Sequence, residues 1–384
     1  MKLAKRMERL GTETAFEVLA KAKKLEAEGK KIIHLEIGEP DFDTPENISN
    51  AAIDALKKGF THYNPSPGLP ELRQTIADYM SKTRGLNFTS DEVVVMPGGK
   101  PVMFYAILAI VEEEDEVIYP NPGFPIYESM INFIGAKAVP IPLKEEKGFA
   151  FDIEDFKKLV TDRTKMVILN TPHNPTGGVL TKDDILQIAE VIKDKDIWVL
   201  SDEIYSRLIF EGEHFSIASV DGFKDRTIIL DGYSKYYAMT GWRAGFGVMN
   251  KEIAPHIAKL VTNSVSCTNT FVQKACIEAL TGPQDSVDKM REEFRARREI
   301  IVDGLNSIPG FSCVMPHGAF YSFPNITKTG YKSKELQDHL LYQAGVASLA
   351  GTSFGAYGEG YLRFSYANSR ENIKEAIKKI KEVL

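Results

Sequence analysis

Cysteine is scarce in this sequence, and long apolar segments are missing from it. Only three cysteines occur among 384 residues, Cys267, Cys276 and Cys313. They form neither a C-x-x-C pair nor a regular framework, so we expect reduced thiols in a cytoplasmic protein, with no disulfide scaffold and no metal site. The longest apolar run, Met103 to Val111, is too short to cross a bilayer, and no apolar stretch follows the basic N-terminal residues. Neither a membrane span nor an export signal is therefore predicted.

Positive charge is not in excess either. The formal net charge is −6, from 47 basic and 53 acidic side chains that are interspersed along the chain. This balance argues against nucleic acid or an anionic membrane as the main partner and favours small molecules. A hydrophobic content of 43 % and a charged content of 26 % are typical of a folded protein. At this length we expect two domains rather than one core.

Short runs rich in valine and isoleucine alternate with amphipathic segments between residues 90 and 250. The runs are "EVVVM", "DEVIY", "AVPI", "KMVIL", "IWVL" and "RTIIL". This alternation predicts an α/β fold with a mostly parallel sheet. Thr181 and Asp184 form a capping-box pattern, which predicts a helix whose buried face carries Ile185, Ile188, Ala189 and Ile192. In an open α/β sheet ligands bind beyond the carboxyl ends of the strands, so catalytic residues are expected directly after each apolar run.

The domain boundaries are expected where the alternation of apolar runs and amphipathic segments ends. We expect a large domain over residues 45–283, with helices on both faces of its sheet, and a smaller α+β domain built from residues 1–44 and 284–384. "IGEPDFDTP" is a crossing point rich in turn-forming residues. Helices are predicted over residues 13–29, over "DKMREEFRARREIIVDGL" and over the C-terminal segment, whose apolar face would hold Ile373, Ile377, Ile380 and Leu384.

Several polar signals follow the apolar runs. "PGGK" (97–100) leads into a helix, whose start suits an anion, while Pro101 replaces the hydroxyl residue that a Walker loop needs. "NTPHNPTGG" and "SDEIY" place amides and carboxylates at strand ends, where a carboxylate facing a ligand requires a cation. "SKYYAMTGWRAG" puts Lys235 and Arg243 eight positions apart. Each signal alone is compatible with a turn, a loop or a solvated surface. Together, an amine, a carboxylate, a phosphate site and a second cation suit pyridoxal phosphate.

These motifs also carry a resemblance to a known family. From "EIGEPDFDTP" to "YLRFSYA" the chain resembles the class I aminotransferases of the fold-type I pyridoxal-phosphate enzymes, nearest to the aspartate and aromatic aminotransferases. "NPTG", "SDEIY" and "SKYYAMTGWRAG" stand in that family's order and spacing. The resemblance implies a homodimer that transfers the amino group of an L-amino acid to a 2-oxo acid such as 2-oxoglutarate by a ping-pong mechanism.

The resemblance assigns catalytic roles to individual residues. Lys235 matches the lysine that binds the cofactor covalently and then moves a proton at the substrate Cα. Asp202 matches the acid that pairs with the pyridine nitrogen. Asn174 and Tyr205 match the pair that hydrogen-bonds the phenolic oxygen.

Other residues match the family's phosphate site. Arg243 matches the phosphate-binding arginine, and the backbone of Gly99 and Lys100 completes the site. Many relatives carry serine three residues before the lysine, but Gly232 stands there in this chain. Ser234 is the candidate substitute, or the site has one donor fewer.

Two aromatic residues and an arginine complete the implied site. Tyr63 matches a tyrosine that reaches the phosphate of the neighbouring subunit, so the active site would need a dimer. Phe124 matches an aromatic ring that stacks on the cofactor. Arg363 matches the arginine that binds the substrate α-carboxylate, with Asn174 and the backbone at Gly38 beside it.

The amino donor is left open between two classes. Lys100 matches a lysine that helps to hold the distal carboxylate in aspartate aminotransferases of this subgroup. Glu13, however, stands near the position of small hydroxyl residues in relatives, and it would repel a second carboxylate unless it points away. Aromatic amino acids therefore remain a rival donor class.

Three other functions are alternatives to an aminotransferase. A carbon–sulfur β-lyase on the same scaffold would use the same cofactor residues, and it would release pyruvate and ammonia without an acceptor. A regulatory protein that senses the cofactor would carry a basic helix-turn-helix extension, which we do not find. A dinucleotide dehydrogenase would open with G-x-G-x-x-G after its first strand, and no such motif occurs.

Overall fold

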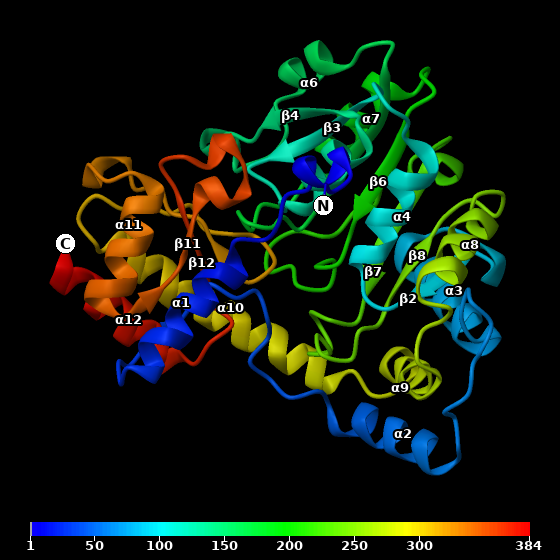
Figure 1. The fold of residues 1–384 in the computed structure, drawn as a ribbon, viewed down its shortest axis with the longest axis horizontal. Helices are drawn as coiled ribbons and strands as arrows, with labels where there is room; N and C mark the ends of the chain where they lie inside the picture. The colour runs from blue at the N-terminus through cyan, green and yellow to red at the C-terminus, as the bar shows by residue number, and fades with distance from the viewer. Residues whose placement is uncertain (1) are drawn as a thin grey trace.

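A mixed sheet of seven strands forms the centre of the computed structural model, which describes residues 2–384 (Figure 1). The strand order is β2-β8-β7-β6-β5-β3-β4. All neighbours are parallel except β8, which is antiparallel to β2 and β7. The prediction of a mostly parallel sheet is confirmed. The strands are β2 Val93–Met96, β3 Glu116–Asn121, β4 Lys137–Pro142, β5 Thr164–Asn170, β6 Trp198–Asp202, β7 Thr227–Gly232 and β8 Gly245–Val248.

Helices pack on both faces of this sheet, which explains why its strands read as unbroken apolar runs. One face is covered by α4 Lys100–Ile110, α5 Ile126–Ile134 and α8 Ala254–Ser264, and the other by α6 Ile153–Leu159 and α7 Lys182–Ile192. The predicted capping box of α7 is confirmed, because Thr181 Oγ1 accepts from the Asp184 N–H and the Asp184 carboxylate accepts from the Thr181 N–H. Its four expected core residues are buried.

Three further helices pack together near the edge strand β2 and its neighbour β8. They are α2 Glu46–Lys57, α3 Pro70–Arg84 and α9 Thr270–Thr281. The segment from β7 to β8 packs on the same core, which contains Tyr233, Tyr236 and Tyr237. This core therefore supports the chain on both sides of Lys235.

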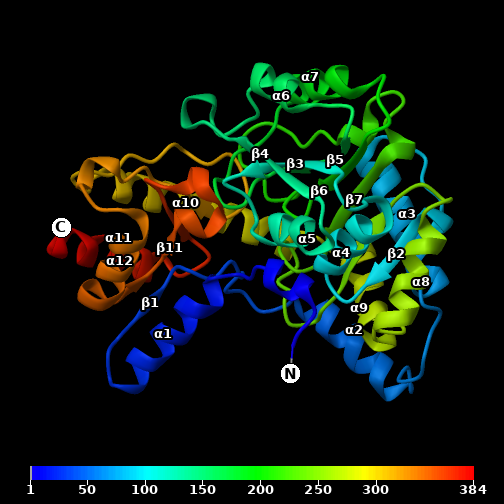
Figure 2. The same ribbon diagram turned by 45° about the horizontal axis from the view of Figure 1, so that its top comes forward.

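Helix α1 and strand β1, near the start of the chain, lie beside the C-terminal elements α11 and α12 next to the large sheet (Figure 2). β1 Ile33–His34 pairs in parallel with β10 Val346–Ala347. A second small sheet joins β11 Leu349–Ala350, β12 Leu362–Ser365 and β9 Tyr321–Ser322. The helices of this part are α1 Ala15–Ala27, α10 Asp285–Asn306, α11 Ser333–His339 and α12 Arg370–Val383. The exact division at residues 44/45 and 283/284 stays a prediction.

One detail of the C-terminal helix differs from the sequence prediction. Ile373, Ile377 and Ile380 are buried as expected, but Leu384 is 41 % exposed. The helix ends at Val383, so Leu384 no longer follows the helical face of the other three.

Short helical turns complete the structure. They are η1 Lys5–Arg9, η2 Ser90–Glu92, η3 Glu145–Lys147, η4 Ile217–Ser219, η5 Lys224–Arg226, η6 Thr327–Thr329, η8 Gly351–Phe354, η9 Ala356–Gly358 and the π-helical turn η7 Leu340–Ala344. Among residues 2–384, no helix combines the length and apolar character that crossing a membrane requires.

Candidate active site

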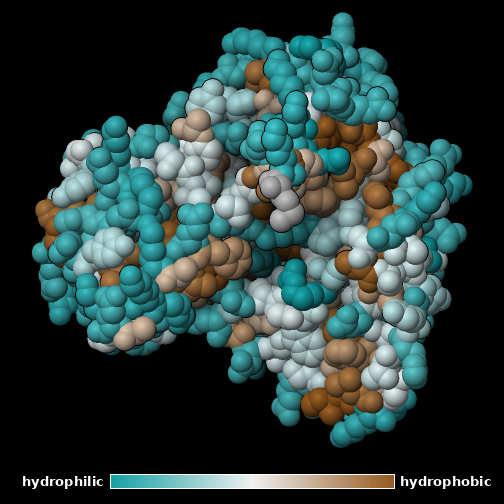
Figure 3. Space-filling model, viewed as in Figure 1, coloured by the Kyte–Doolittle hydropathy of each residue, from teal (hydrophilic) through white to brown (hydrophobic). Residues whose placement is uncertain are grey.

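A cavity of about 530 Å³ opens at the carboxyl ends of β5, β6 and β7. Figure 3 shows a hollow in the middle of the face that it draws, between the lobe with α1 and α12 and the lobe with the large sheet. Every sequence-predicted site residue except Tyr63 lines this cavity: Gly38, Gly99, Lys100, Phe124, Asn174, Asp202, Tyr205, Ser234, Lys235, Arg243 and Arg363. The structure therefore brings together residues from seven separate motifs.

Lys235 lies in the turn that follows β7, with its amine on the wall of the cavity. Its Nζ donates to the backbone oxygen of Gly38 at 2.6 Å and lies 5.8 Å from the centroid of the Tyr205 ring. Burial lowers the pKa of Lys235 to about 8, and the positive charge of Arg363 acts in the same direction. A lowered pKa leaves more of the amine neutral at physiological pH, which a nucleophile or proton acceptor requires.

Asp202 is the last residue of β6 and is nearly buried. Burial raises the pKa of Asp202 to about 6, although hydrogen bonds from Tyr127 and the Ile204 backbone favour the ionised form. The Tyr127 hydroxyl donates to Oδ2 at 2.6 Å and the Ile204 N–H donates to Oδ1 at 3.2 Å. A buried carboxylate on a cavity wall is costly unless a cationic group faces it, so this position suits a protonated nitrogen of a ligand.

A candidate anion site lies where α4 begins. Gly98 has a φ of +98°, and a Cβ at this position would lie 2.3 Å from Nη2 of Arg243, so glycine lets the guanidinium approach. Within the described residues, no acceptor is found for the backbone N–H of Gly99 or Lys100. These donors, the Arg243 guanidinium and the nearby Ser234 hydroxyl suit a phosphate group.

Arg363 lies on β12 and is 4 % exposed. Its guanidinium lies between the rings of Tyr321 and Phe354, at 4.5 and 4.8 Å from their centroids. Nη1 donates to Asn174 Oδ1 at 3.0 Å, and Nη2 donates to the backbone oxygen of Glu36. The buried Nε has no partner among residues 2–384. An unpaired buried donor is costly, so this guanidinium is suited to an anionic ligand group.

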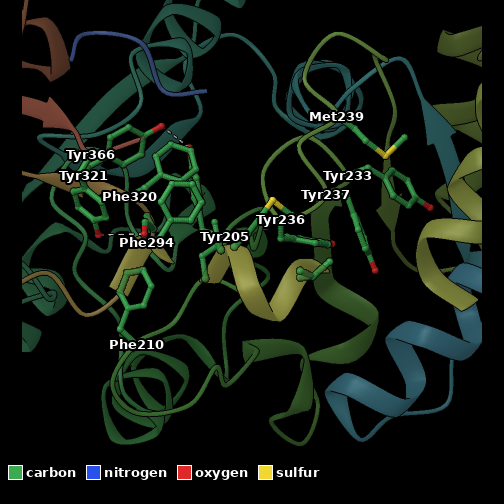
Figure 4. Close-up of a cluster of buried hydrophobic side chains, with 14 of the residues drawn as sticks. Tyr205, Phe210, Tyr233, Tyr236, Tyr237, Met239, Phe294, Phe320, Tyr321 and Tyr366 are labelled. Atoms are coloured by element: carbon green, nitrogen blue, oxygen red, sulfur yellow. Dashed lines mark hydrogen bonds between the residues drawn. The ribbon is translucent and has the colours of Figure 1, made fainter. Parts of the chain in front are cut away.

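Two tyrosines of the site were not predicted. The hydroxyl oxygens of Tyr321 and Tyr205 lie 2.7 Å apart, and Figure 4 shows the two side chains pointing toward one another. Tyr127 is the hydrogen-bond donor to Asp202. Tyr127 belongs to the same "NPGFPIY" motif as Phe124, but nothing in the motif tells which aromatic side chain faces the carboxylate. "AFYSF", which contains Tyr321, carries no such signal either.

Lys100 and Glu13 form an ion pair at the cavity wall. Glu13 therefore does not point away from Lys100, and the lysine's charge is met by a carboxylate of its own chain. The Lys100 ammonium also lies 5.7 Å from the centroid of the Phe124 ring. Any acidic ligand group that uses Lys100 must compete with Glu13.

Tyr63 lies apart from the cavity of its own chain. It stands between α2 and α3 and is 89 % exposed. Its expected contact with a neighbouring subunit stays a prediction.

Comparison with known proteins places the chain among transaminases. The family described as "Aminotransferase class I and II" matches residues 30–380. A probable aspartate/prephenate aminotransferase of Aquifex aeolicus is 42 % identical over 100 % of this chain and 98 % of its own length. Aromatic-amino-acid aminotransferase 2 of Thermococcus litoralis is 39 % identical over 92 % of each chain. The solved structure of the Thermus thermophilus aspartate aminotransferase with maleate has a TM-score of 0.96 at 36 % identity, with 100 % of both chains covered.

These matches extend over the whole length of the chain and agree with the resemblance seen in its motifs. The fold-type I architecture expected from that resemblance is confirmed. The relatives are named as aminotransferases, and the β-lyase alternative finds no support among them. Proteins of this family depend on pyridoxal phosphate. The chain therefore belongs to the class I and II aminotransferase family, and it is an aminotransferase.

Proposed function

We propose that this enzyme uses pyridoxal phosphate to transfer the amino group of an L-amino acid, with aspartate as the first candidate, to 2-oxoglutarate in a ping-pong reaction. The observation that carries the proposal is the convergence of Lys235, Asp202 and Arg363 on one cavity beside a phosphate-binding helix start. Aspartate is placed first because relatives are named as aspartate aminotransferases and because Lys100 lies in the cavity.

The residues present fit pyridoxal phosphate as a donor set. Arg243, Ser234 and the free N–H groups of Gly99 and Lys100 would hold the phosphate. Asp202 would hold the proton of the pyridine nitrogen, because its carboxylate has no cationic partner among residues 2–384. The Phe124 ring lines the same cavity and would stack on the ring of the cofactor.

The bound cofactor supplies an aldehyde and an electron-withdrawing ring that stabilises a carbanion at the substrate Cα. Lys235 would supply the amine that attaches the cofactor and, once free, would accept the proton from the substrate Cα. Asp202 would keep the ring nitrogen protonated. Arg363 would hold the α-carboxylate through its Nε and the donors next to it, and this contact would orient the substrate in the cavity. The Tyr205 hydroxyl and the Asn174 amide are proposed to hold the phenolic oxygen.

Replacing Arg363 with alanine should raise the KM for the amino acid by about 100-fold or more while the cofactor content stays normal. The physical reason is that the variant loses a charge-assisted contact to the α-carboxylate and no group that touches the proposed phosphate site. Steady-state kinetics with aspartate and the absorbance of the bound cofactor measure both quantities. Loss of bound cofactor would show that Arg363 has a different role.

Replacing Glu13 with glutamine should raise kcat/KM for aspartate by about tenfold, because Lys100 is then free for a distal carboxylate. The value for phenylalanine should change less than about twofold. Glu17→Gln is the matched control, since Glu17 is exposed in the first turn of α1 and does not line the cavity. If aspartate gains nothing, or if aspartate and glutamate react no faster than alanine in the parent enzyme, Lys100 does not bind a distal carboxylate.

We also propose a homodimer in which Tyr63 reaches the neighbouring active site. Tyr63 is almost fully exposed, and α2 and the turn after it carry further exposed apolar side chains, Ile53, Leu56 and Phe60. Figure 3 shows apolar surface over this end of the molecule. Sedimentation at micromolar concentration should give twice the mass of the chain, and activity should return when inactive Lys235→Ala chains are mixed with inactive Tyr63→Ala chains. A monomeric, active enzyme would contradict the proposal.

A further inference from the structure

Two fully buried carboxylates lie directly behind the proposed catalytic pair. Glu203 follows Asp202 at the end of β6, and Asp231 is the residue before the last of β7; both are 0 % exposed. Successive side chains of a strand point to opposite faces of the sheet. Asp202 and Leu230 line the cavity, whereas Glu203 and Asp231 do not. The two carboxylates therefore lie on the face that is turned away from the substrate.

Arg84, the last residue of α3, joins these two carboxylates. Its Nε donates to Oε2 of Glu203 at 2.7 Å, and its Nη2 donates to Oδ2 of Asp231 at 3.2 Å. Arg84 is itself buried, and its contact with Glu203 holds the pKa of that carboxyl well below its usual range despite burial. Ser201, Ser216 and His214 also lie within hydrogen-bond distance of Glu203. Such complete pairing is what buried charges require, and it fixes their geometry.

The same network reaches the neighbour of Lys235. Oδ1 of Asp231 accepts from the Tyr236 hydroxyl at 3.0 Å and from the Gly232 N–H at 2.7 Å. Tyr236 follows Lys235 directly in the chain and is 1 % exposed. Arg84 thus connects Glu203, the residue after Asp202, through Asp231 with Tyr236, the residue after Lys235. None of these contacts lies on the cavity wall.

We propose that Arg84, Glu203, Asp231 and Tyr236 are positioning residues that fix the Lys235 amine relative to the Asp202 carboxylate. The inference rests on the roles proposed above for Lys235 and Asp202. Since both groups are proposed to act on one bound ring, their separation has to match it. A misplacement of about 1 Å in such a geometry can cost about 100-fold in rate.

The Tyr236→Phe variant tests this inference with the least disturbance. It removes one hydroxyl and keeps the ring, which packs on Tyr237 and under the guanidinium of Arg207. Tyr237→Phe is the matched control, because Tyr237 is equally buried but its hydroxyl bonds to Gln284 and Arg207 instead of Asp231. Figure 4 shows Tyr233, Tyr236 and Tyr237 as one group of buried rings.

With the cofactor-loaded enzyme, Tyr236→Phe should lower kcat about tenfold and leave KM within about twofold, whereas Tyr237→Phe should change neither. The pH midpoint of the cofactor's visible absorbance band should also move by about half a unit in Tyr236→Phe alone. Thermal unfolding of both variants separates these changes from a loss of stability. Equal kcat values and equal band midpoints for the two variants would overturn the inference.

Variants of Arg84 provide the second arm. Arg84→Lys keeps the positive charge, but an ammonium group lacks the planar donors that bind both carboxylates at once. This variant should therefore show the same fall in kcat and a similar shift in the pH midpoint of the absorbance band as Tyr236→Phe. If Arg84→Lys does not fold, the comparison of Tyr236→Phe with Tyr237→Phe still decides the question. A wrong assignment of the function would give a different result from a wrong assignment of the positioning residues. In that case Lys235→Ala would retain turnover, whatever the effect of Tyr236→Phe.

Discussion

Replacing Lys235 with alanine should lower kcat by at least about 10⁴-fold, the largest effect expected for any single side chain of this enzyme. The amine is proposed to act twice, first in attaching the cofactor and then in moving the proton at the substrate Cα. The pKa of the amine is lowered to about 8, so it is suited to both tasks near neutral pH. Pyridoxal phosphate should still bind without covalent attachment, because the phosphate donors at the start of α4 and at Arg243 are intact. Single-turnover reaction with aspartate measures the loss.

Lys100 supplies the control, since it is the other lysine that lines the cavity. Lys100→Ala should keep the covalent attachment and affect mainly the choice of donor. Borohydride treatment of the parent enzyme, followed by digestion and mass measurement, should find the pyridoxyl mass on the peptide that contains Lys235. A label on any other peptide, or turnover by Lys235→Ala within about tenfold of the parent, would contradict the proposal.

The sheet and the position of the site could be predicted from the sequence for a physical reason. A strand buried on both faces is apolar throughout, so the first polar residues after it mark the sheet edge where ligands bind. Asp202 and Lys235 were found in this way, and the structure places both on one cavity. The proposed phosphate site could be predicted because a glycine pair before a helix leaves backbone donors free.

Contacts that depend on tertiary packing could not be predicted. Tyr127 and Tyr321 are aromatic residues in aromatic-rich segments, and only the packed structure shows that their hydroxyls meet Asp202 and Tyr205. The sequence shows Glu203 only as an acidic residue of "SDEIY" at a strand end. Its partner Arg84 lies more than a hundred positions away, at the end of helix α3, and no local pattern links two residues so far apart.

Replacing Asp202 with asparagine should lower kcat by about 10³-fold while the cofactor still binds, because the amide fills the same space but cannot hold the proton on the pyridine nitrogen. The pH dependence of cofactor binding distinguishes the loss of the carboxylate from a structural change of the site. In the parent chain burial raises the pKa of Asp202 to about 6, so the carboxyl group is ionised above pH 6 and becomes neutral as the pH falls through 6. The affinity for pyridoxal phosphate should therefore fall below pH 6 in the parent chain and stay nearly constant there in Asp202→Asn.

Tyr127→Phe is the matched control for that pH dependence, since it keeps the carboxylate and removes one of its hydrogen-bond donors. The Tyr127 hydroxyl favours the ionised form of Asp202, so its removal should raise the pKa of Asp202 further. Cofactor binding by Tyr127→Phe should then weaken at a higher pH than in the parent chain, with kcat at pH 8 reduced far less than in Asp202→Asn. If all three chains lose affinity at the same pH, the group that titrates is not Asp202, and the ring nitrogen must be held by another residue.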